Sequence, residues 1–240
     1  MKPLLIPVID LRGGQVVHAI AGKRSDYRPL QSRLTGAIEP VEVLLQLQDA
    51  TGLQTFYIAD LDGIISGQPD WNMLERLTAT GAQLLIDAGA RRVEDLDAVR
   101  LGPNVRPVAG TESFMQIDEL LSQPSPDVVC SLDLHAERLR VADRSLMAAD
   151  VTAEELALRL WTAGCRSWIV LDTASVGTGQ GIPTLPLCRT LRNRFPDADL
   201  ITGGGVYSEQ CVVAAAAAGV TGVLVASALH AGKLGHRFRI

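Results

Sequence analysis

Two aspartates end apolar segments at positions where they could work together as a proton-transfer pair. Asp10 follows the run LLIPVI, and Asp133 closes a similar run that begins near residue 127. A carboxyl group on each side of a bound ligand can give a proton to one atom and take a proton from another, which is general acid and base catalysis. The competing interpretation is that one or both carboxylates only cap the turn that follows.

A glycine-rich segment indicates a phosphate site. The chain reads Thr202-Gly-Gly-Gly-Val206 just before a helix that is expected to begin near Ser208. Glycines let backbone N–H groups approach an anion closely, and the positive end of the helix dipole adds to the attraction. The next apolar segment ends in two small residues that would expose their amides in the same way. A tight turn without a ligand is the alternative. The predicted phosphate-binding residues are Gly204, Gly205, Ala226 and Ser227.

A second pair of segments mixes residues that attract a phosphate with residues that repel it. Asp87 and Glu112 carry negative charge, whereas neighbouring backbone amides and a guanidinium would bind an anion. The residues therefore leave a second phosphate site and its absence equally open. The candidate members of this second site are Gly89, Arg91, Gly110 and Thr111.

Other polar residues complete the set of candidates. Asp60 and Asp172 end two further apolar segments, and the basic loop 22–29 contains Lys23 and Arg24. This loop could close over an anionic ligand as a lid, or it could be a solvated charged loop. We predict no cofactor and no metal, because the sequence has no dinucleotide or Walker fingerprint and its four cysteines are widely spaced. The cysteines are expected in the core.

Apolar segments of strand length alternate with segments of helical periodicity along the whole chain. Such alternation predicts a parallel sheet, which could be open or closed into a barrel. Strands are predicted at 4–10, 53–60, 82–87, 105–110, 127–133, 166–172, 198–203 and 221–226. Helices are predicted at 40–50, 70–80, 93–101, 114–121, 152–163, 184–194 and 208–218.

An internal duplication favours the barrel. The segment around Asp10 matches the segment around Asp133, and three later strand ends of the first half match strand ends of the second half in the same order. The three later pairs are Asp60 with Asp172, 87–89 with 203–205, and 108–111 with 224–227. Two similar halves close naturally into eight strands, whereas an open sheet gives no reason for the pairing. We predict one (β/α)₈ barrel domain over 1–240, with half-barrels at about 1–123 and 124–240, and Asp10 and Asp133 at its carboxyl end.

Composition limits the partners of the chain. Its 240 residues are 47% hydrophobic and 20% charged, with a net charge of −5, so nothing favours nonspecific binding to nucleic acid or to a membrane surface. The chain opening resembles no signal peptide, and no apolar run approaches membrane-spanning length, so we expect a cytoplasmic protein. The predicted partner is a phosphorylated small molecule, and the sequence does not determine the oligomeric state.

Several of these motifs together resemble the HisA/HisF family of histidine biosynthesis over nearly the whole chain. The segments that carry the resemblance are PVIDLRGGQV at 7–16, ADLDG at 59–63, SLD at 131–133, TGGGV at 202–206 and VLVASAL at 223–229. The resemblance implies a barrel that performs an Amadori rearrangement, with Asp10 as the base and Asp133 as the acid. It also implies that two symmetry-related pairs of loops hold the two phosphates of the substrate.

Three segments depart from the family pattern. Leu171-Asp172 stands where the isomerase branch has Thr-Asp, and Val176 stands where it has the aspartate of Asp-Gly-Thr. Asp87-Ala88-Gly89 replaces a run of glycines. The segment GKRSDYRPLQS is instead similar to a side branch found in methanogens and in bacteria with archaeal-type one-carbon metabolism.

Three hypotheses about function follow. The leading one is a phosphosugar isomerase that converts a phosphorylated aminoaldose into the aminoketose by acid–base catalysis. The second is a related phosphosugar lyase or synthase of methanopterin- or methanofuran-type coenzyme biosynthesis. The third is a barrel that binds a phosphorylated metabolite without turnover. Retention of both Asp10 and Asp133 argues against the third, because a pure binder does not need two carboxylates beside an anion.

Overall fold

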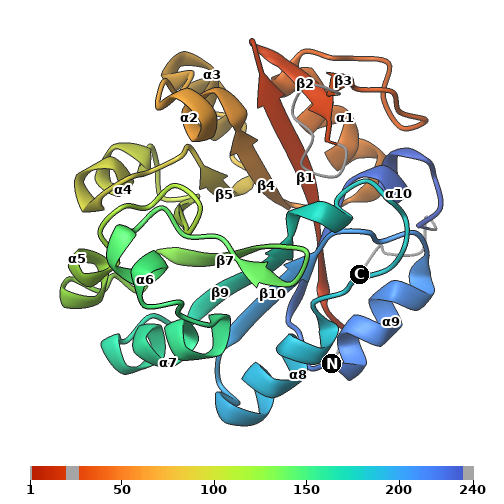
Figure 1. The fold of residues 1–240 in the computed structure, drawn as a ribbon. Helices are drawn as coiled ribbons and strands as arrows, with labels where there is room; N and C mark the ends of the chain where they lie inside the picture. Colours follow the sequence, from red (N-terminus) through yellow and green to blue (C-terminus); the bar gives the residue numbers. More distant parts are fainter. Residues whose placement is uncertain (1, 20–26, 235–240) are drawn as a thin grey trace.

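The computed structural model describes residues 2–19 and 27–234, and they form a closed parallel barrel (Figure 1). Each barrel strand pairs in parallel with the next, and the last strand pairs with the first, so the sheet has no free edge within the barrel. The predicted (β/α)₈ barrel is therefore confirmed. Its strands are β1 (Leu4–Arg12), β4 (Thr55–Asp60), β5 (Gln83–Asp87), β6 (Val105–Gly110), β7 (Val129–His135), β9 (Ser167–Asp172), β10 (Asp199–Gly203) and β11 (Gly222–Val225).

Helices surround the barrel, and their ends carry the expected signals. Glu39 caps α1 through its carboxylate and Pro40 occupies the first helical position, where a missing N–H costs nothing. Thr152 and Glu155 form a reciprocal capping box at the start of α7. All seven predicted helices are present, with boundaries shifted by a few residues. They are α1 (Pro40–Thr51), α3 (Trp71–Thr78), α4 (Val93–Val99), α5 (Ile117–Ser122), α7 (Ala153–Ala163), α8 (Leu185–Arg194) and α9 (Glu209–Ala217).

The core has two layers, because alternate residues of each strand face opposite sides of the sheet. Along β4, Phe56 and Ile58 pack with the helices, whereas Tyr57 and Ala59 belong to the cluster inside the barrel. Each of the other seven barrel strands also contributes one or two residues to this inner cluster. The cluster fills the barrel as a packed core. The four cysteines are buried, as predicted.

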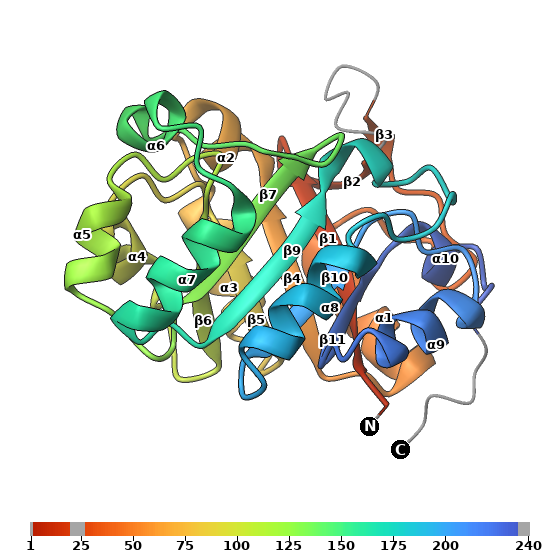
Figure 2. The same ribbon diagram turned by 60° about the horizontal axis from the view of Figure 1, so that its bottom comes forward.

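The sequence did not reveal several short elements that decorate the barrel. They are too short for a periodic pattern to identify them. They are β2 (Gln15–His18), β3 (Arg28–Pro29), α2 (Leu61–Ser66), β8 (Arg138–Leu139), α6 (Arg144–Ala148), the 3₁₀ turn η2 (Thr173–Ser175) and α10 (Ser227–His230). Figure 2 shows β2, β3, α2 and α6 at the end of the barrel opposite the N terminus, which is the carboxyl end of the strands. In the described ranges, no helix is both long and apolar enough to cross a membrane.

Candidate active site

A cavity of about 210 Å³ opens at the carboxyl end of the barrel. Its polar lining comes from strand ends on both halves of the chain, as expected for a site in this fold. Asp10 and Asp133 both line it, as do all four residues of the predicted phosphate site. Polar lining residues include Asp10, Tyr57, Asp87, Glu112, Asp133, Arg140 and Ser227.

The Asp10 carboxyl group lies near the end of β1 and is largely shielded from solvent. No hydrogen bond joins this carboxyl group to another residue in the described ranges. Burial raises the pKa of Asp10 to about 7, because the ionised form loses hydration that nothing nearby replaces. A carboxyl group with this pKa is a stronger base than an exposed aspartate and still ionises near neutral pH.

The Asp133 carboxyl group is held more firmly. Ser131 Oγ donates to Asp133 Oδ1 at 2.6 Å, and the Glu112 amide donates to Oδ2 at 3.2 Å. Burial, together with the negative charges of Glu112 and Asp87, raises the pKa of Asp133 to about 8 against the lowering effect of the hydrogen bonds. Asp133 therefore keeps its proton at neutral pH, which suits a general acid.

Tyr57 and Asp87 form a buried pair on the floor of the cavity. Tyr57 donates its hydroxyl proton to Asp87 Oδ2 at 3.2 Å, and the Gly89 amide donates to Asp87 Oδ1 at 2.9 Å. Burial raises the pKa of Asp87 to about 6 despite these hydrogen bonds. Burial, with the charges of Asp87, Asp133 and Asp10, raises the pKa of Tyr57 well above its ordinary value. The phenol thus stays protonated among three carboxyl groups.

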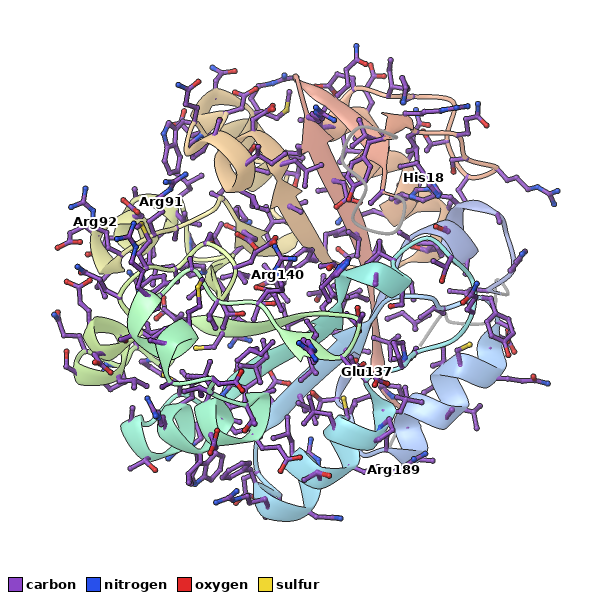
Figure 3. All side chains as sticks on the ribbon, in the orientation of Figure 1. His18, Arg91, Arg92, Glu137, Arg140 and Arg189 are labelled. Atoms are coloured by element: carbon purple, nitrogen blue, oxygen red, sulfur yellow. The ribbon has the colours of Figure 1, made fainter. Side chains whose placement is uncertain are left out.

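Sequence reasoning missed Tyr57 and Arg140 as cavity residues. Tyr57 shares a two-residue period with Ala59 of the inner layer, but periodicity alone does not tell which face of a strand is inside. Arg140 follows the short hairpin of β7 and β8, where its amide donates to the Asp133 carbonyl at 2.7 Å. Figure 3 shows Arg140 over the middle of the barrel, whereas Arg91 and Arg92 lie at the periphery near α4.

The predicted phosphate corner is assembled from two consecutive strand ends. Gly204 and Gly205 follow β10 with φ values of 81° and 76°, a region that favours glycine. A Cβ on Gly204 would collide with Ser175 Oγ, so the close packing of this loop also requires a glycine. Ser227 begins α10, and its hydroxyl lies 3.0 Å from His18 Nε2. We call Gly204, Gly205, Ala226 and Ser227 the phosphate corner.

The four candidate members of the second phosphate site do not line the barrel cavity. The Gly89 amide donates to Asp87, and the Thr111 amide donates to the Ser131 carbonyl at 3.0 Å. Gly110 packs so tightly that a Cβ there would lie 3.0 Å from Asp133 Oδ2. The guanidinium of Arg91 lies beside Gly67, and none of Gly89, Arg91, Gly110 and Thr111 lines the cavity. The Gly89 and Thr111 amides are thus engaged by the protein, and Gly89 and Arg91 line a separate pocket outside the barrel cavity.

Asp60 and Asp172 hold loops. Asp60 accepts hydrogen bonds from the amides of Asp62, Gly63 and Asp70 at 2.8–3.1 Å. Asp172 accepts from the amides of three residues, Ala136, Glu137 and Ala174, at 2.7–3.1 Å. Both side chains are buried and neither lines the cavity. In the structure they accept hydrogen bonds from the backbone amides of nearby loops and helix starts, as capping residues do. Lys23 and Arg24 lie outside the described residues.

The raised pKa values predict that stability falls as pH rises. Asp10 and Asp133 have folded pKa values of about 7 and about 8, whereas an unfolded aspartate has a pKa of roughly 3.9. Below these folded pKa values the folded state binds more protons than the unfolded state. The two carboxyl groups therefore stabilise the fold at low pH, and this stabilisation is lost as pH rises through their folded pKa values. Half-buried His18 and buried His230 have lowered pKa values because burial disfavours their charged forms. They act in the opposite direction, and their effect is lost once the unfolded histidines, with a pKa of roughly 6.5, have given up their protons.

Urea unfolding from about pH 7.5 to about pH 8.5 isolates the aspartate effect, because unfolded histidines, with a pKa of roughly 6.5, have largely lost their protons there. We expect the free energy of unfolding to fall across this range, and to fall less in Asp133→Asn, which has no proton to lose. Constant or rising stability in the wild type would contradict the placement of these carboxyl groups.

Comparison with known proteins is consistent with this geometry. The family model described as histidine biosynthesis protein matches residues 4–235. An uncharacterized protein of Methanocaldococcus jannaschii is 28% identical over 96% of this chain and 94% of its own length. A protein of Acaryochloris marina is 34% identical over 94% of this chain and 87% of its own length. A protein of Leuconostoc mesenteroides is 26% identical over 95% of each chain.

The Acaryochloris and Leuconostoc proteins are named as isomerases of an imidazole-4-carboxamide that bears two phosphoribosyl groups. Their similarity extends over most of each chain. The family match covers nearly all the described residues. The chain therefore belongs to the histidine biosynthesis protein family, the HisA/HisF family that its motifs resemble.

Proposed function

We propose that the protein catalyses the Amadori-type isomerisation of a phosphorylated aminoaldose to the aminoketose. Asp10 is the base, Asp133 is the acid, and the phosphate corner anchors the substrate. The observation that carries this proposal is the presence, in one cavity, of two carboxyl groups with different environments beside a glycine-lined corner. Named isomerases among the relatives support the same reaction class.

The proton transfers follow from the two environments. Asp133 gives its proton to the ring oxygen, the bond between C1 and that oxygen breaks, and the nitrogen lone pair forms an iminium at C1. Asp10 then removes the proton from C2, and the C2–H electrons form the carbon–carbon double bond of an enaminol. Transfer of a proton to C1 and loss of the enol proton give the aminoketose. The product is an isomer of the substrate, so the reaction needs no oxidant or reductant.

The raised pKa values suit these roles. Asp133, with a pKa of about 8, holds a proton at neutral pH, and Asp10, with a pKa of about 7, is about half ionised there. Ionised Asp10 can accept a proton while protonated Asp133 donates one, because the two groups titrate in this order. The phosphate corner supplies binding energy at a distance from the reacting carbons.

Solvent deuterium exchange tests the reaction. The purified protein is incubated in D₂O with a panel of N-substituted ribosylamine 5-phosphates, and the products are followed by NMR and mass spectrometry. We expect an aminoketose that carries solvent deuterium at C1, and only a small fraction of that product in the same time with Asp10→Asn or Asp133→Asn. Phosphate binding without any exchange across the panel would favour a barrel that binds its metabolite without turnover.

The phosphate corner makes a separate prediction at Ser227. Ser227→Asp places a carboxylate where the bound anion would lie, and a unit charge repulsion near a protein surface can reach roughly 4 kcal/mol at 4 Å. We expect phosphate affinity to fall by at least about tenfold, a change of about 1.4 kcal/mol in binding free energy. Isothermal titration with inorganic phosphate measures the effect.

Ser227→Ala is the matched control, because it keeps the backbone amide and adds no charge. It should bind phosphate within about fivefold of the wild type, since a lost neutral hydrogen bond to His18 costs roughly 1 kcal/mol or less. Position 227 serves better than Gly204, where any side chain would collide with Ser175. Equal phosphate affinity in Ser227→Asp and the wild type would place the anion elsewhere.

A further inference from the structure

A basic groove lies on the outer side of the phosphate corner. This outer groove encloses about 610 Å³ beside the hairpin of β2 and β3 and the short helix α10. Its positively charged side chains are Arg28, Arg33 and Lys233, and two histidines, His18 and His230, line it as well. Among the described residues that line the groove, none is an aspartate or a glutamate.

The positive charges of the outer groove have no counter-charge in the described part of the protein. Arg28, Arg33 and Lys233 are exposed, and none of them forms an ion pair with another described residue. The chain as a whole has a net charge of −5, so this grouping runs against its overall balance. Like charges in one concave surface raise the local potential and attract an anion.

Hydrogen bonds hold the segments that carry these cations together. His18 pairs with Arg28 across the β2–β3 hairpin. The Arg33 amide donates to the His230 carbonyl at 2.8 Å, and His230 Nδ1 lies 2.9 Å from Ser32 Oγ. His230 is buried, and its ring therefore fixes the 28–33 segment against α10. The groove is a built feature of the fold.

The outer groove is continuous with the candidate active site. Gly177, Val206 and Ser227 line both the barrel cavity and the groove. The Ser227 hydroxyl, in the phosphate corner, contacts His18 Nε2 in the groove at 3.0 Å. If a ligand places one phosphate in the corner, a second anionic group attached to that phosphate would therefore extend toward the groove cations.

We propose that the outer groove binds a second phosphate, joined or close to the first, so that the substrate carries a diphosphate end. The proposal rests on the phosphate corner of the proposed function. It differs from the arrangement with phosphates at opposite ends of the cavity, because the strand ends across the barrel from the corner present Asp87, Glu112 and Asp133 against one arginine, Arg140. Both anionic groups then bind on the side of the barrel where Arg28, Arg33 and Lys233 lie.

Comparing two anions tests the proposal. Isothermal titration with inorganic phosphate and with inorganic pyrophosphate, at low ionic strength and without divalent cations, should show pyrophosphate binding at least about tenfold tighter, since a second anionic group gains the groove cations. In Arg33→Gln/Lys233→Gln, pyrophosphate affinity should fall by about tenfold or more, while phosphate affinity should change by less than about threefold.

Arg189→Gln, which removes a positive charge away from the groove, is the control. Arg189 is exposed on α8 and lines neither the cavity nor the groove, and Figure 3 shows it at the outer edge of the barrel. This variant should bind both anions like the wild type. Equal affinities for phosphate and pyrophosphate in the wild type, or pyrophosphate binding unchanged in the groove variant, would overturn the diphosphate proposal and leave the phosphate corner intact. Undetectable binding of both anions would overturn the corner together with the groove.

Discussion

Asp133→Asn and Asp10→Asn should each lower isomerase turnover by about 10²–10⁴-fold, the range that a positioned acid or base contributes. Asparagine has nearly the same shape as aspartate, so Ser131 and the Glu112 amide can still contact the side chain at 133. It cannot give a proton to the ring oxygen, nor, at position 10, take one from C2. The loss should appear in kcat, because the phosphate corner is untouched.

The pH profile separates the two roles. In the wild type, turnover should rise as Asp10 ionises near its pKa of about 7 and fall as Asp133 loses its proton near its pKa of about 8. The residual turnover of Asp10→Asn should lack the acidic limb, and that of Asp133→Asn should lack the alkaline limb. Steady-state kinetics over this range measures both limbs. Wild-type turnover in both variants would show that neither aspartate transfers a proton.

The second large effect concerns the substrate of the named isomerases, which bears two phosphoribosyl groups. We expect the protein to turn it over far more slowly than roughly 1 per second, the lower end of ordinary enzymatic rates. Asp87 and Glu112 place negative charge where the far phosphate would lie, and the Gly89 amide that could bind it is already donated to Asp87. Leu171 and Val176 line the same cavity and offer no hydrogen bond.

Each lost hydrogen bond to a charged group costs about 1.5–3 kcal/mol, and repulsion by buried carboxylates adds to that cost. Asp87→Gly should therefore raise kcat/KM for this substrate by at least about tenfold, since it removes a charge and frees the Gly89 amide. Asp87→Asn is the matched comparison, because it removes the charge and keeps the side-chain volume. Wild-type turnover of about 1 per second or faster, lost in Asp10→Asn and Asp133→Asn, would show that this is the natural substrate.

Most of the fold could be predicted from local pattern. Apolar segments of strand length located all eight barrel strands, and segments of helical periodicity between them located seven of the helices. The strand-end residues Asp10 and Asp133 and the phosphate corner were also visible, because parallel strands in a barrel bring their carboxyl ends to one face. The half-barrel boundary, and the roles of these residues, stay predictions.

Only the tertiary structure decided which groups each site residue meets. Tyr57 enters the cavity because β4 turns that face inward, and a shift of one residue would have placed Phe56 there. The Gly89 amide is unavailable to a ligand because Asp87 folds back onto it. The sequence marked Asp60 and Asp172 as candidates, and the structure placed them as loop caps.

The outer groove depends on the longest-range contacts of all. Arg28 and Arg33 lie about 200 positions before Lys233, and no local pattern relates them. They meet because β1 pairs with β11 and closes the barrel, which brings the first hairpin of the chain beside its last described helix. The sequence determined the strands, their order and the residues at their ends, since these follow from short-range periodicity. Closure decided which ends became neighbours, because charge and hydrogen bonding at a site depend on distance in space and not on separation along the chain.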